Sequence, residues 1–455
     1  MPHVRPSVCC MIDEKVVICF SWEQRNKMVL KEIRRFRNPV LVLGGGMTGL
    51  GIARTLGRQG IDIYLVVDRM DEAVFSKYCK RSFMVADLRY DRDVLKNFLE
   101  KIGRSLSRRI VAYPTSDLDA LNLSELKDEL ADNYHFVVGD REPVEILVNK
   151  SKFYKVLDRN GISYPTTYYA EDVEDVRRIT GKITYPIFIR PSITQLFTRI
   201  FGESKKGFIA YSSRELIHYY KLASRYGIEM MVQEIVPGPP SNSYQLEGYY
   251  NMDHRPTVLF ARQRLRIWPP DFGNTTLCVS IPMAKLAKEK KMINGLLRTI
   301  SYTGLMSAEF KEDAKDGTLK FLEINARAWW HFWLSARCGA DIIFSSYLDA
   351  IGEKTEYIEE YETGVKSIYL LLDLGSSAKM LLNGDLSLTD WSSSFHGATE
   401  FAFLRREDLS PFIMNCAKRG FLLPKQEMQR LKRNILEAVK PRHRVQEFLR
   451  RKDGK

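Results

Sequence analysis

Long apolar runs are missing from this sequence. None of its 455 residues belong to a stretch of about 18 or more consecutive apolar residues, and a helix needs about 20 such residues to cross a bilayer. The short apolar run Val16–Phe20 follows acidic residues, whereas a secretory signal peptide places basic residues before a longer apolar segment. We therefore expect neither a membrane-spanning helix nor a signal peptide.

Cysteine is sparse and unpatterned. The seven cysteines are odd in number and scattered, and no CxxC pair occurs. Structural zinc sites and disulfide frameworks both show closely and regularly spaced cysteines. The sequence therefore predicts neither, and we expect a reducing, cytoplasmic location.

Internal repeats and low-complexity segments are also missing, which argues against a repeat architecture or wholesale disorder. The chain is long, and 45% of its residues are hydrophobic, so we expect two or three domains with packed cores. The formal net charge is +13. This charge is typical of a protein with anionic ligands and equally of an ordinary solvated basic surface, and both interpretations remain open.

The N-terminal residues 1–38 look like an extension to the first domain. They contain no glycine, and Met28 precedes the first strong strand signal by only a few residues. Such a terminus is poorly ordered unless other parts of the chain hold it. We expect residues 1–27 to be dispensable for stability and activity.

Three further regions follow from the pattern of predicted elements. In residues 39–142, strands alternate with helices, which predicts a parallel α/β sheet with helices on both faces. In residues 143–362, longer alternating segments favour antiparallel strands. Residues 363–455 are less regular and end in a basic tail, Lys425–Lys455, with eleven Lys or Arg and four Asp or Glu.

A predicted β-hairpin carries the most informative chemistry. Glu309 and Glu323 lie symmetrically about Asp316, which is next to Gly317, a natural turn residue. In that register the two carboxylates face each other, with Cβ atoms roughly 5 Å apart, and need a cation between them. Asn325 and Arg327 follow on the same strand face. Two carboxylates and an amide oxygen suit Mg²⁺ that carries phosphates, and Arg327 could neutralise a transferring phosphoryl group as a catalytic residue. A surface hairpin with ordinary acids is the alternative.

A strand that ends in a Pro-Gly turn, Gln233–Gly238, suits adenine. Adenine needs a donor and an acceptor along an extended backbone. Glu234 could accept from the amino group of adenine, and the backbone of Ile235 and Val236 could supply the remaining contacts. A strand that simply ends in a turn is the alternative.

Four basic residues are candidates to bind the phosphates of ATP, whose negative charge calls for two or three well-placed cations. Lys150 lies at a predicted helix start, and Arg190 ends a predicted strand. Lys205 and Lys206 precede Gly207, and the sequence does not show which of the two points inward. Solvated surface lysines are the alternative.

A glycine-rich turn, Gly44-x-Gly46-x-x-Gly49, follows the first strand, and Asp68 ends the next one. This spacing matches a dinucleotide-binding fingerprint, so an NAD(P)-binding oxidoreductase is an alternative function. We prefer a turn whose backbone N–H groups receive an anionic part of an acceptor substrate. The predicted contacts are Gly45, Gly46, Thr115, Ser116 and Asp117.

Two clusters later in the chain have competing interpretations. Arg262, Arg264 and Arg266 alternate along one predicted strand and so share a face. That face suits a carboxylate substrate, with Arg264 and Arg266 as the predicted contacts, or is plain surface. The aromatic cluster from Trp329 to Trp333 favours core packing, with His331 structural rather than catalytic.

The order of five segments resembles the ATP-grasp superfamily over residues 39–354. The segments are NKSKFY, YPIFIRPS, VQEIVPG, SAEFK and FLEINAR. Within the superfamily, RQRLRIWPPDFGNTT is similar to the carbamoyl-phosphate-synthetase-like carboxylate–amine ligases. The resemblance implies a parallel α/β pre-ATP-grasp domain, an ATP-grasp unit of two α+β subdomains, and a small basic C-terminal region.

The resemblance also implies a reaction and its cofactors. ATP would phosphorylate a substrate carboxylate, and an amine would then attack the acyl phosphate to form an amide. Lys150 and Arg190 would contact phosphates, Glu234 would lie at the adenine, and Glu309, Glu323 and Asn325 would hold Mg²⁺ or Mn²⁺. The basic loop before Gly207 is bulkier than is usual for the superfamily, and Arg190 stands where a lysine is usual. A catalytically inactive ATP-binding regulator therefore remains an alternative.

The expected partners are small-molecule carboxylates and amines, with no nucleic acid. The sequence leaves open whether the chain forms a homodimer. The basic tail suits either packing against the protein or weak, salt-sensitive contact with an anionic membrane surface.

Overall fold

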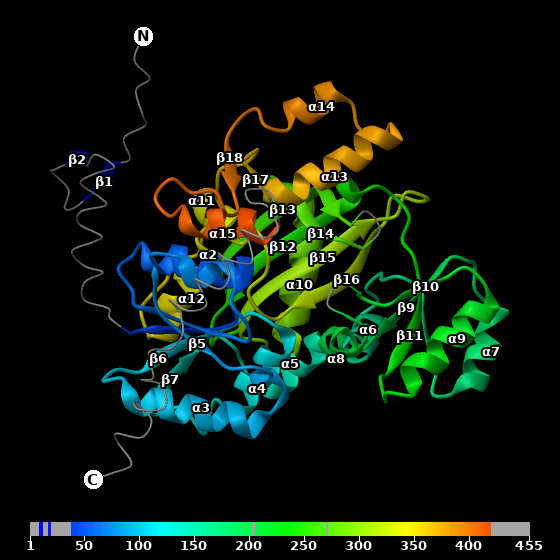
Figure 1. Ribbon diagram of the computed structural model, residues 1–455, viewed down its shortest axis with the longest axis horizontal. Coiled ribbons are helices and arrows are strands. Elements are labelled where there is room, and N and C mark those ends of the chain that lie inside the picture. The colour runs from blue at the N-terminus through cyan, green and yellow to red at the C-terminus, as the bar shows by residue number, and fades with distance from the viewer. Residues whose placement is uncertain (1–8, 12–16, 20–37, 203–204, 270–271, 420–455) are drawn as a thin grey trace.

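The computed structural model describes residues 9–11, 17–19, 38–202, 205–269 and 272–419 (Figure 1). Near the N-terminus, β1 (Cys9–Met11) and β2 (Val17–Cys19) pair as antiparallel strands. The expectation that residues 1–27 are dispensable falls largely outside the described residues, and the membrane expectation for Lys425–Lys455 falls entirely outside them. Within the described part, no helix combines the length and the apolar character needed to cross a membrane.

The first domain is a five-stranded parallel sheet with the order β5-β4-β3-β6-β7. Its strands are β3 (Val40–Leu43), β4 (Ile63–Val67), β5 (Cys79–Met84), β6 (Ile110–Pro114) and β7 (Tyr134–Phe136). Along β3, Leu41 and Leu43 enter one hydrophobic core while Val40 and Val42 enter another. Both faces are therefore covered, as the run of apolar residues predicts for a parallel strand.

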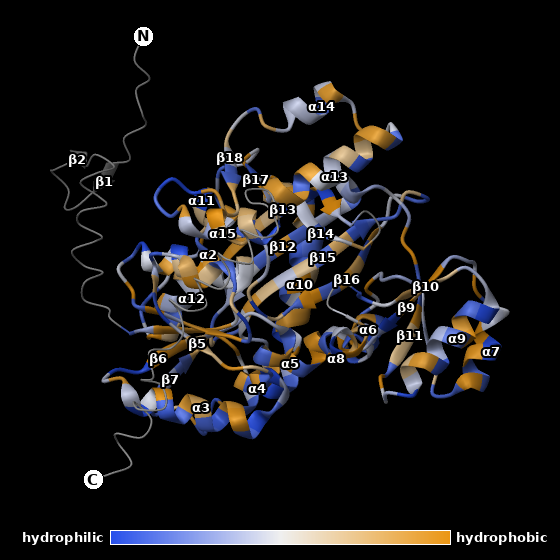
Figure 2. Ribbon diagram, viewed as in Figure 1, coloured by the Kyte–Doolittle hydropathy of each residue, from blue (hydrophilic) through white to orange (hydrophobic). Residues whose placement is uncertain are grey.

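Helices cover the two faces of this sheet. They are α2 (Gly46–Gly57), α3 (Arg92–Ser105) and α4 (Asp117–Leu126). Hydrophobic and hydrophilic residues mix along α3 (Figure 2), and its residues Leu95, Leu99 and Ile102 are buried. That spacing is the apolar stripe of an amphipathic helix. The predicted parallel α/β domain is confirmed.

Two short helices connect the first domain to the rest of the chain. They are α5 (Arg141–Val148) and α6 (Lys150–Arg159), and α6 begins at Lys150, as predicted. The break falls at Asn149, whose side chain accepts a hydrogen bond from the Lys152 N–H at 3.1 Å. Asn149 is therefore the N-cap of α6, and asparagine is among the preferred residues at that position.

A small lobe contains a four-stranded antiparallel sheet with the order β10-β9-β11-β8. Its strands are β8 (Thr167–Tyr169), β9 (Ile187–Pro191), β10 (Phe208–Ala210) and β11 (Met230–Glu234). Helices α7 (Val173–Thr180) and α9 (Ser213–Ser224) pack on it around a separate hydrophobic core. This lobe lies at one end of the molecule (Figure 1). Helix α8 (Thr194–Phe201) occupies part of the basic segment expected to be a loop.

The largest sheet has seven strands in the order β16-β15-β12-β13-β14-β17-β18. They are β12 (Ser243–Tyr250), β13 (Pro256–Trp268), β14 (Asn274–Ser280), β15 (Gly304–Glu312), β16 (Leu319–Asn325), β17 (Lys366–Ile368) and β18 (Thr399–Phe401). Leu246 and Ala308 pack on the side of α10 (Ala287–Thr299), whereas Tyr249 and Phe260 pack on the other side. Strands β12 to β16 pair antiparallel, as expected, and β17 adds a further antiparallel strand beside β14.

The segment after residue 362 is part of this architecture. Strands β17 and β18 extend the large sheet. Helices α13 (Leu370–Asn383) and α14 (Leu388–Ser393) follow β17, and α15 (Ser410–Lys418) packs against the first domain. The described residues 364–419 thus form an integral part of the sheet and of its contacts with the first domain.

Candidate active site

The two glutamates of the predicted hairpin face each other. Strands β15 and β16 pair with Glu309 opposite Glu323 and with Ser307 opposite Asn325, and Gly317 in the turn has φ +71°. Glu309, Glu323 and Asn325 therefore lie on one face of the sheet. The predicted register is confirmed.

Cations surround this carboxylate pair. Glu323 Oε2 lies 2.9 Å from Arg190 Nη2 of β9 and 3.4 Å from Lys150 Nζ of α6. Glu309 Oε2 lies 3.1 Å from Nη2 of Arg264, which belongs to β13. Burial would raise the pKa of Glu323, but the positive charges of Lys150, Arg190, Lys206 and Arg327 outweigh it and hold that pKa well below its usual range. Glu323 is therefore ionised throughout the physiological range.

Arg190 joins three groups through its planar guanidinium. Besides Glu323, it donates to Tyr154 Oη at 2.9 Å and to Gln233 Oε1 at 3.0 Å. Tyr154 and Gln233 come from α6 and β11, so Arg190 connects these two elements to Glu323 of the large sheet. A lysine at this position could not reach three such partners in one plane.

Of the two lysines before Gly207, only Lys206 makes a polar contact within the described residues. Its Nζ donates to Asn274 Oδ1 at 3.1 Å, and its charge acts on Glu309 and Glu323. Both lysines are exposed, but the Lys205 side chain has no partner among those residues. The geometry therefore favours Lys206 as the inward-facing residue.

Arg327 is held beside the glutamates by the first domain. Its Nε donates to Asp117 Oδ1 at 2.8 Å, and its Nη2 donates to Asn325 Oδ1 at 2.8 Å. Asp117 Oδ2 accepts in turn from Gln195 Nε2 of α8 at 2.8 Å. Asp117 thus positions Arg327 and helix α8 together. No sequence pattern indicates Gln195, because its segment was expected to be a loop.

Glu234 and the backbone after it meet the requirements for adenine. The Glu234 carboxylate is half-buried and forms an ion pair with Lys320 of β16, whose hydrogen bond lowers the pKa of Glu234 against the opposing effect of burial. Within the described residues, the N–H groups of Ile235 and Val236 have no hydrogen-bond partner. An extended backbone with free polar groups therefore lies directly after Glu234.

The three arginines of β13 have three different acidic partners. Arg262 pairs with Glu247 at 2.6 Å and Arg264 with Glu309. Arg266 was predicted to contact a carboxylate substrate, and its contacts contradict this prediction. It is buried, donates to both Asp373 oxygens at 2.9 and 2.7 Å, and donates to Ser394 Oγ at 2.7 Å. Its donors therefore tie α13 to the sheet, and only Arg264 reaches the carboxylate pair.

The glycine-rich turn also differs from its prediction. The Gly46 N–H donates to Asp71 Oδ2 at 2.7 Å, and a Cβ on Gly45 would lie 1.8 Å from the same oxygen. The chain's own carboxylate therefore occupies the start of α2, where Gly45 and Gly46 were expected to bind an anion. The same contact leaves no room there for the pyrophosphate of a dinucleotide, which argues against the oxidoreductase alternative.

Thr115 and Ser116 serve the fold rather than a ligand. Thr115 Oγ1 donates to the Leu43 carbonyl at 2.6 Å, and Ser116 Oγ caps α4 by accepting from the Asp119 N–H at 3.1 Å. Ser116 is also buried. The predicted substrate contacts of both hydroxyl groups are therefore not supported, because each hydroxyl already has a partner inside the domain.

The aromatic cluster lies in the core, as expected. Trp329, Phe332 and Trp333 are buried with α2 and α12 (Ile342–Ala350). His331 is fully buried, and its ring nitrogens lie 2.8 Å from Ser367 Oγ and 3.0 Å from the Thr275 carbonyl. Burial lowers the pKa of His331 to about 3, so this histidine is a neutral structural residue at physiological pH.

The donor set fits a metal that brings ligands of its own. Among the described residues, no group of three or more His, Cys, Asp or Glu side chains is arranged to hold a metal ion. Two facing carboxylates and the Asn325 amide oxygen supply only part of a coordination shell. Mg²⁺ is usually bound by one or two carboxylates together with phosphate oxygens and water, so this partial set suits a metal bound with a nucleotide.

Several known proteins are similar to this chain in sequence or in structure. No family model matches the chain. The D-aspartate ligase of Enterococcus faecium is 26% identical over 303 residues, which cover 63% of this chain and 70% of the ligase. The carbamoyl phosphate synthase large chain of Saccharolobus islandicus is 22% identical over 336 residues, or 71% of this chain. This chain spans only 30% of the length of that synthase.

Solved structures agree on the fold. The biotin carboxylase domain of Hydrogenobacter thermophilus 2-oxoglutarate carboxylase, in complex with MgADP and bicarbonate, aligns with a TM-score of 0.57 and 17% identity over 73% of this chain and 74% of that one. The L-amino acid ligase of Bacillus licheniformis aligns with a TM-score of 0.53 and 14% identity over 70% and 76%. The fold is therefore the ATP-grasp fold. By sequence, the chain is similar to a D-aspartate ligase and to carbamoyl phosphate synthase large chains.

Proposed function

We propose that this chain is an ATP-dependent ligase that joins a carboxylate to an amine through an acyl phosphate. The observation that carries the proposal is the register of Glu309 opposite Glu323, with Asn325 on the same face and Lys150, Arg190 and Arg327 around them. A surface hairpin would not collect three buried or half-buried cations from three different parts of the chain. A site for nucleotide phosphates and a divalent metal requires such a collection.

The proposed reaction has two steps. A carboxylate oxygen of the first substrate attacks the γ-phosphorus of ATP, and the bond to ADP breaks. The amine nitrogen then attacks the acyl carbon, the C–O bond to phosphate breaks, and the nitrogen loses a proton as the amide forms. Mg²⁺, held by Glu309, Glu323 and Asn325, would neutralise phosphate charge during the transfer.

The side chains mainly position substrates and neutralise charge. Lys150, Arg190 and Lys206 would hold the phosphates, and Arg327, fixed by Asp117, would face the transferring phosphoryl group. Glu234 and the free backbone groups of Ile235 and Val236 would bind adenine. No residue needs to become covalently modified.

Arg264 is the best-supported contact for the substrate carboxylate. It reaches the acid pair through one terminal nitrogen, while its Nε is buried without a hydrogen-bond partner among the described residues. A buried donor without a partner costs about 1–3 kcal/mol. A carboxylate bound beside Glu309 would satisfy it, and the D-aspartate and L-amino acids for which two similar ligases are named carry this group.

The test is ADP formation from MgATP across a panel of amino acids, dipeptides and cell-wall precursors, each offered singly and in pairs. We expect ADP release that depends on one carboxylate and one amine, with the amide detected by mass spectrometry. Complete dependence on NAD(P), or no ADP above background with any pair, would contradict the proposal.

The matched variants are Glu323→Ala and Glu312→Gln. Loss of a main electrostatic contact to the reacting phosphates should lower the rate by roughly 100-fold or more, so Glu323→Ala should abolish measurable turnover. Glu312 lies at the end of the same hairpin, and among the described residues its carboxylate accepts a hydrogen bond from Tyr244 alone, so its substitution should leave turnover unchanged. Turnover of Glu323→Ala within threefold of the parent would exclude Glu323 as a metal ligand.

A further inference from the structure

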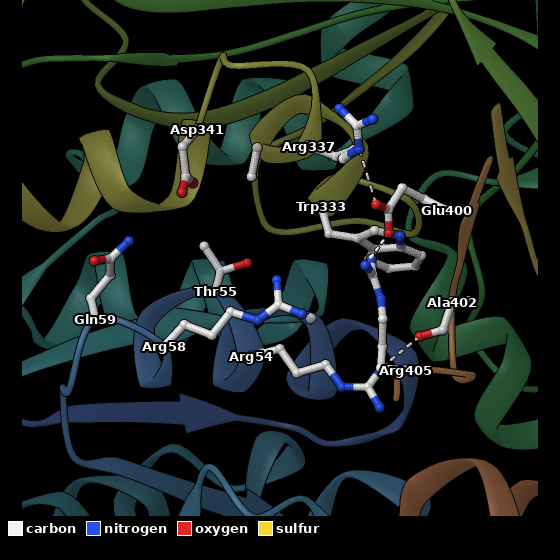
Figure 3. A pocket seen from close by; sticks show the side chains of 12 residues that line it. Arg54, Thr55, Arg58, Gln59, Trp333, Arg337, Asp341, Glu400, Ala402 and Arg405 are labelled. Atoms are coloured by element: carbon white, nitrogen blue, oxygen red, sulfur yellow. Dashed lines mark hydrogen bonds and ion pairs between the residues drawn. The ribbon is translucent and has the colours of Figure 1, made fainter. Parts of the chain in front are cut away.

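A cavity of about 330 Å³ lies apart from the carboxylate pair. Helix α2 of the first domain forms one wall, residues 333–341 form another, and the strand β18 with residues 402–405 forms the third (Figure 3). None of the residues assigned above to ATP, metal or substrate lines it. Its ionisable lining consists of Arg54, Arg58, Arg337, Arg405, Asp341 and Glu400.

Two of the four arginines use most of their donors in contacts within the protein. Arg54 pairs with Asp408 at 2.8 Å and donates to the carbonyl groups of Ala402 and Phe403. Arg337 pairs with Glu362 at 2.8 Å and with Glu400 at 3.2 Å. These two arginines therefore shape the cavity and keep few donors for a ligand.

Arg58 and Arg405 retain donors. Within the described residues, Arg58 has a single acidic partner, Glu407, and 41% of its side chain is exposed. Its guanidinium extends over α2 toward the middle of the cavity (Figure 3). Arg405 pairs with Glu400 from one terminal nitrogen, while its Nε is buried and has no partner in the described structure.

The wall beside Arg405 adds another unused donor. Trp333 lies next to Glu400 and Arg405 (Figure 3). Trp333 is 7% exposed, and its Nε1 also has no partner among the described residues. Burial lowers the pKa of Arg405, and the nearby charges of Arg58 and Arg54 lower it further. An oxyanion would offset both the desolvation and this mutual repulsion.

We propose that this cavity binds a small phosphate monoester, with the phosphate held between Arg58 and Arg405. The two guanidinium groups come from opposite walls. A phosphate offers three terminal oxygens in different directions, whereas a carboxylate offers two in one plane. The volume exceeds that of a lone phosphate, so the ester portion would extend toward Thr55, Gln59 and Asp341. The Asp341 carboxylate at that end favours a neutral or cationic group over a second anion.

Isothermal titration calorimetry with glycerol 1-phosphate, inorganic phosphate and succinate tests the proposal on the full chain. We expect glycerol 1-phosphate to bind, and Arg58→Gln to weaken this binding about tenfold, the effect of losing one charge-assisted hydrogen bond. Arg178→Gln is the matched control, because Arg178 is also an exposed helical arginine with one acidic partner, Asp175. This control and the active-site variant Arg190→Gln should bind as the parent does.

The other outcomes test this inference and the proposed ligase function separately. Equal binding by Arg58→Gln and the parent would exclude the cavity as the binding site. Binding lost in Arg190→Gln but kept in Arg58→Gln would place the phosphate at the active site instead, and the proposed ligase function would survive. Succinate binding as tight as that of the monoester would contradict phosphate as the class of ligand. Arg58-dependent phosphate binding in a chain without ATP turnover would uphold this inference and reject the ligase function.

Discussion

At the scale of single residues, the site is a balance between two facing carboxylates and the cations around them. Arg190 shows the balance most clearly, because one guanidinium contacts Glu323, Tyr154 and Gln233 from three elements. A lysine is usual at this position in the superfamily. The planar fork of arginine explains why the substitution keeps the charge and also adds two neutral hydrogen bonds.

This arrangement predicts that Arg190→Lys keeps the fold but lowers kcat/KM for ATP. Lysine cannot keep the two neutral contacts and the ion pair at once, and each lost hydrogen bond costs about 1 kcal/mol. We expect a loss of about tenfold, measured by steady-state kinetics with varied MgATP. Arg178→Lys on α7 is the control, because the ion pair of Arg178 is with Asp175 and not with a residue of the site. An unchanged kcat/KM would show that the fork geometry has no function.

His331 gives a second residue-scale prediction, about stability and pH. Burial lowers its folded pKa to about 3 from an ordinary value of 6.5, so the unfolded chain binds this proton more readily. Its contribution to stability is therefore complete above about pH 6.5 and is lost as the pH falls toward 3. Across this window one proton corresponds to about 1.4 kcal/mol per pH unit.

The measurement is urea unfolding between pH 6.5 and 4.5. We expect His331→Gln to be less stable than the parent at pH 7 but to lose stability less steeply on acidification, by about one proton. His218→Gln, on the exposed side of α9, is the control and should follow the parent. Parallel curves for His331→Gln and the parent would contradict the assignment of His331 as a buried neutral residue.

At the scale of elements, the sequence predicts the hairpin well and the neighbouring contacts poorly. The spacing of Glu309 and Glu323 about a glycine turn is local information, and local turn geometry sets the register of a hairpin. Arg266 could not be predicted in the same way. The pairing of β13 shifts between Arg264 and Arg266, and Asp373, its partner, lies 107 residues away.

The glycine-rich turn shows the same limit. Its spacing correctly predicts a strand, a turn and a helix. The occupant of the helix start is Asp71, 25 residues further along the chain, and no pattern around Gly46 indicates it. Likewise, the sequence places Asp117 near the crevice but does not show that its carboxylate holds Arg327 and Gln195. Long-range side-chain pairing decides these details.

At the scale of the whole molecule, the C-terminal segment connects the large sheet to the first domain. Asp408 is almost fully buried and accepts hydrogen bonds from Arg54, Ser76 Oγ and the Lys77 N–H. Asn415 of α15 donates to Glu72 at 2.9 Å. Composition and charge predict only a basic region here, because these partners lie more than 300 residues apart in the sequence.

We therefore predict that Asp408→Ala lowers the free energy of unfolding by about 3–5 kcal/mol, since it leaves Arg54 buried and unpaired. The adjacent Glu407→Ala is the matched control. Glu407 pairs with Arg58 at the surface, where both side chains are about 40% exposed, and such pairs contribute about 0–1 kcal/mol. Urea unfolding of both variants measures the difference. Similar losses would mean that the C-terminal segment does not depend on the buried pair.

The central claim is the acyl phosphate, and oxygen-isotope transfer tests it most directly. The active substrate acid is prepared with ¹⁸O in both carboxylate oxygens and incubated with MgATP, the amine and the full chain. If a carboxylate oxygen attacks the γ-phosphorus and later leaves with it, each amide formed releases one phosphate that carries one ¹⁸O, as read by mass spectrometry or ³¹P NMR. Amide formation with unlabelled phosphate would contradict the account.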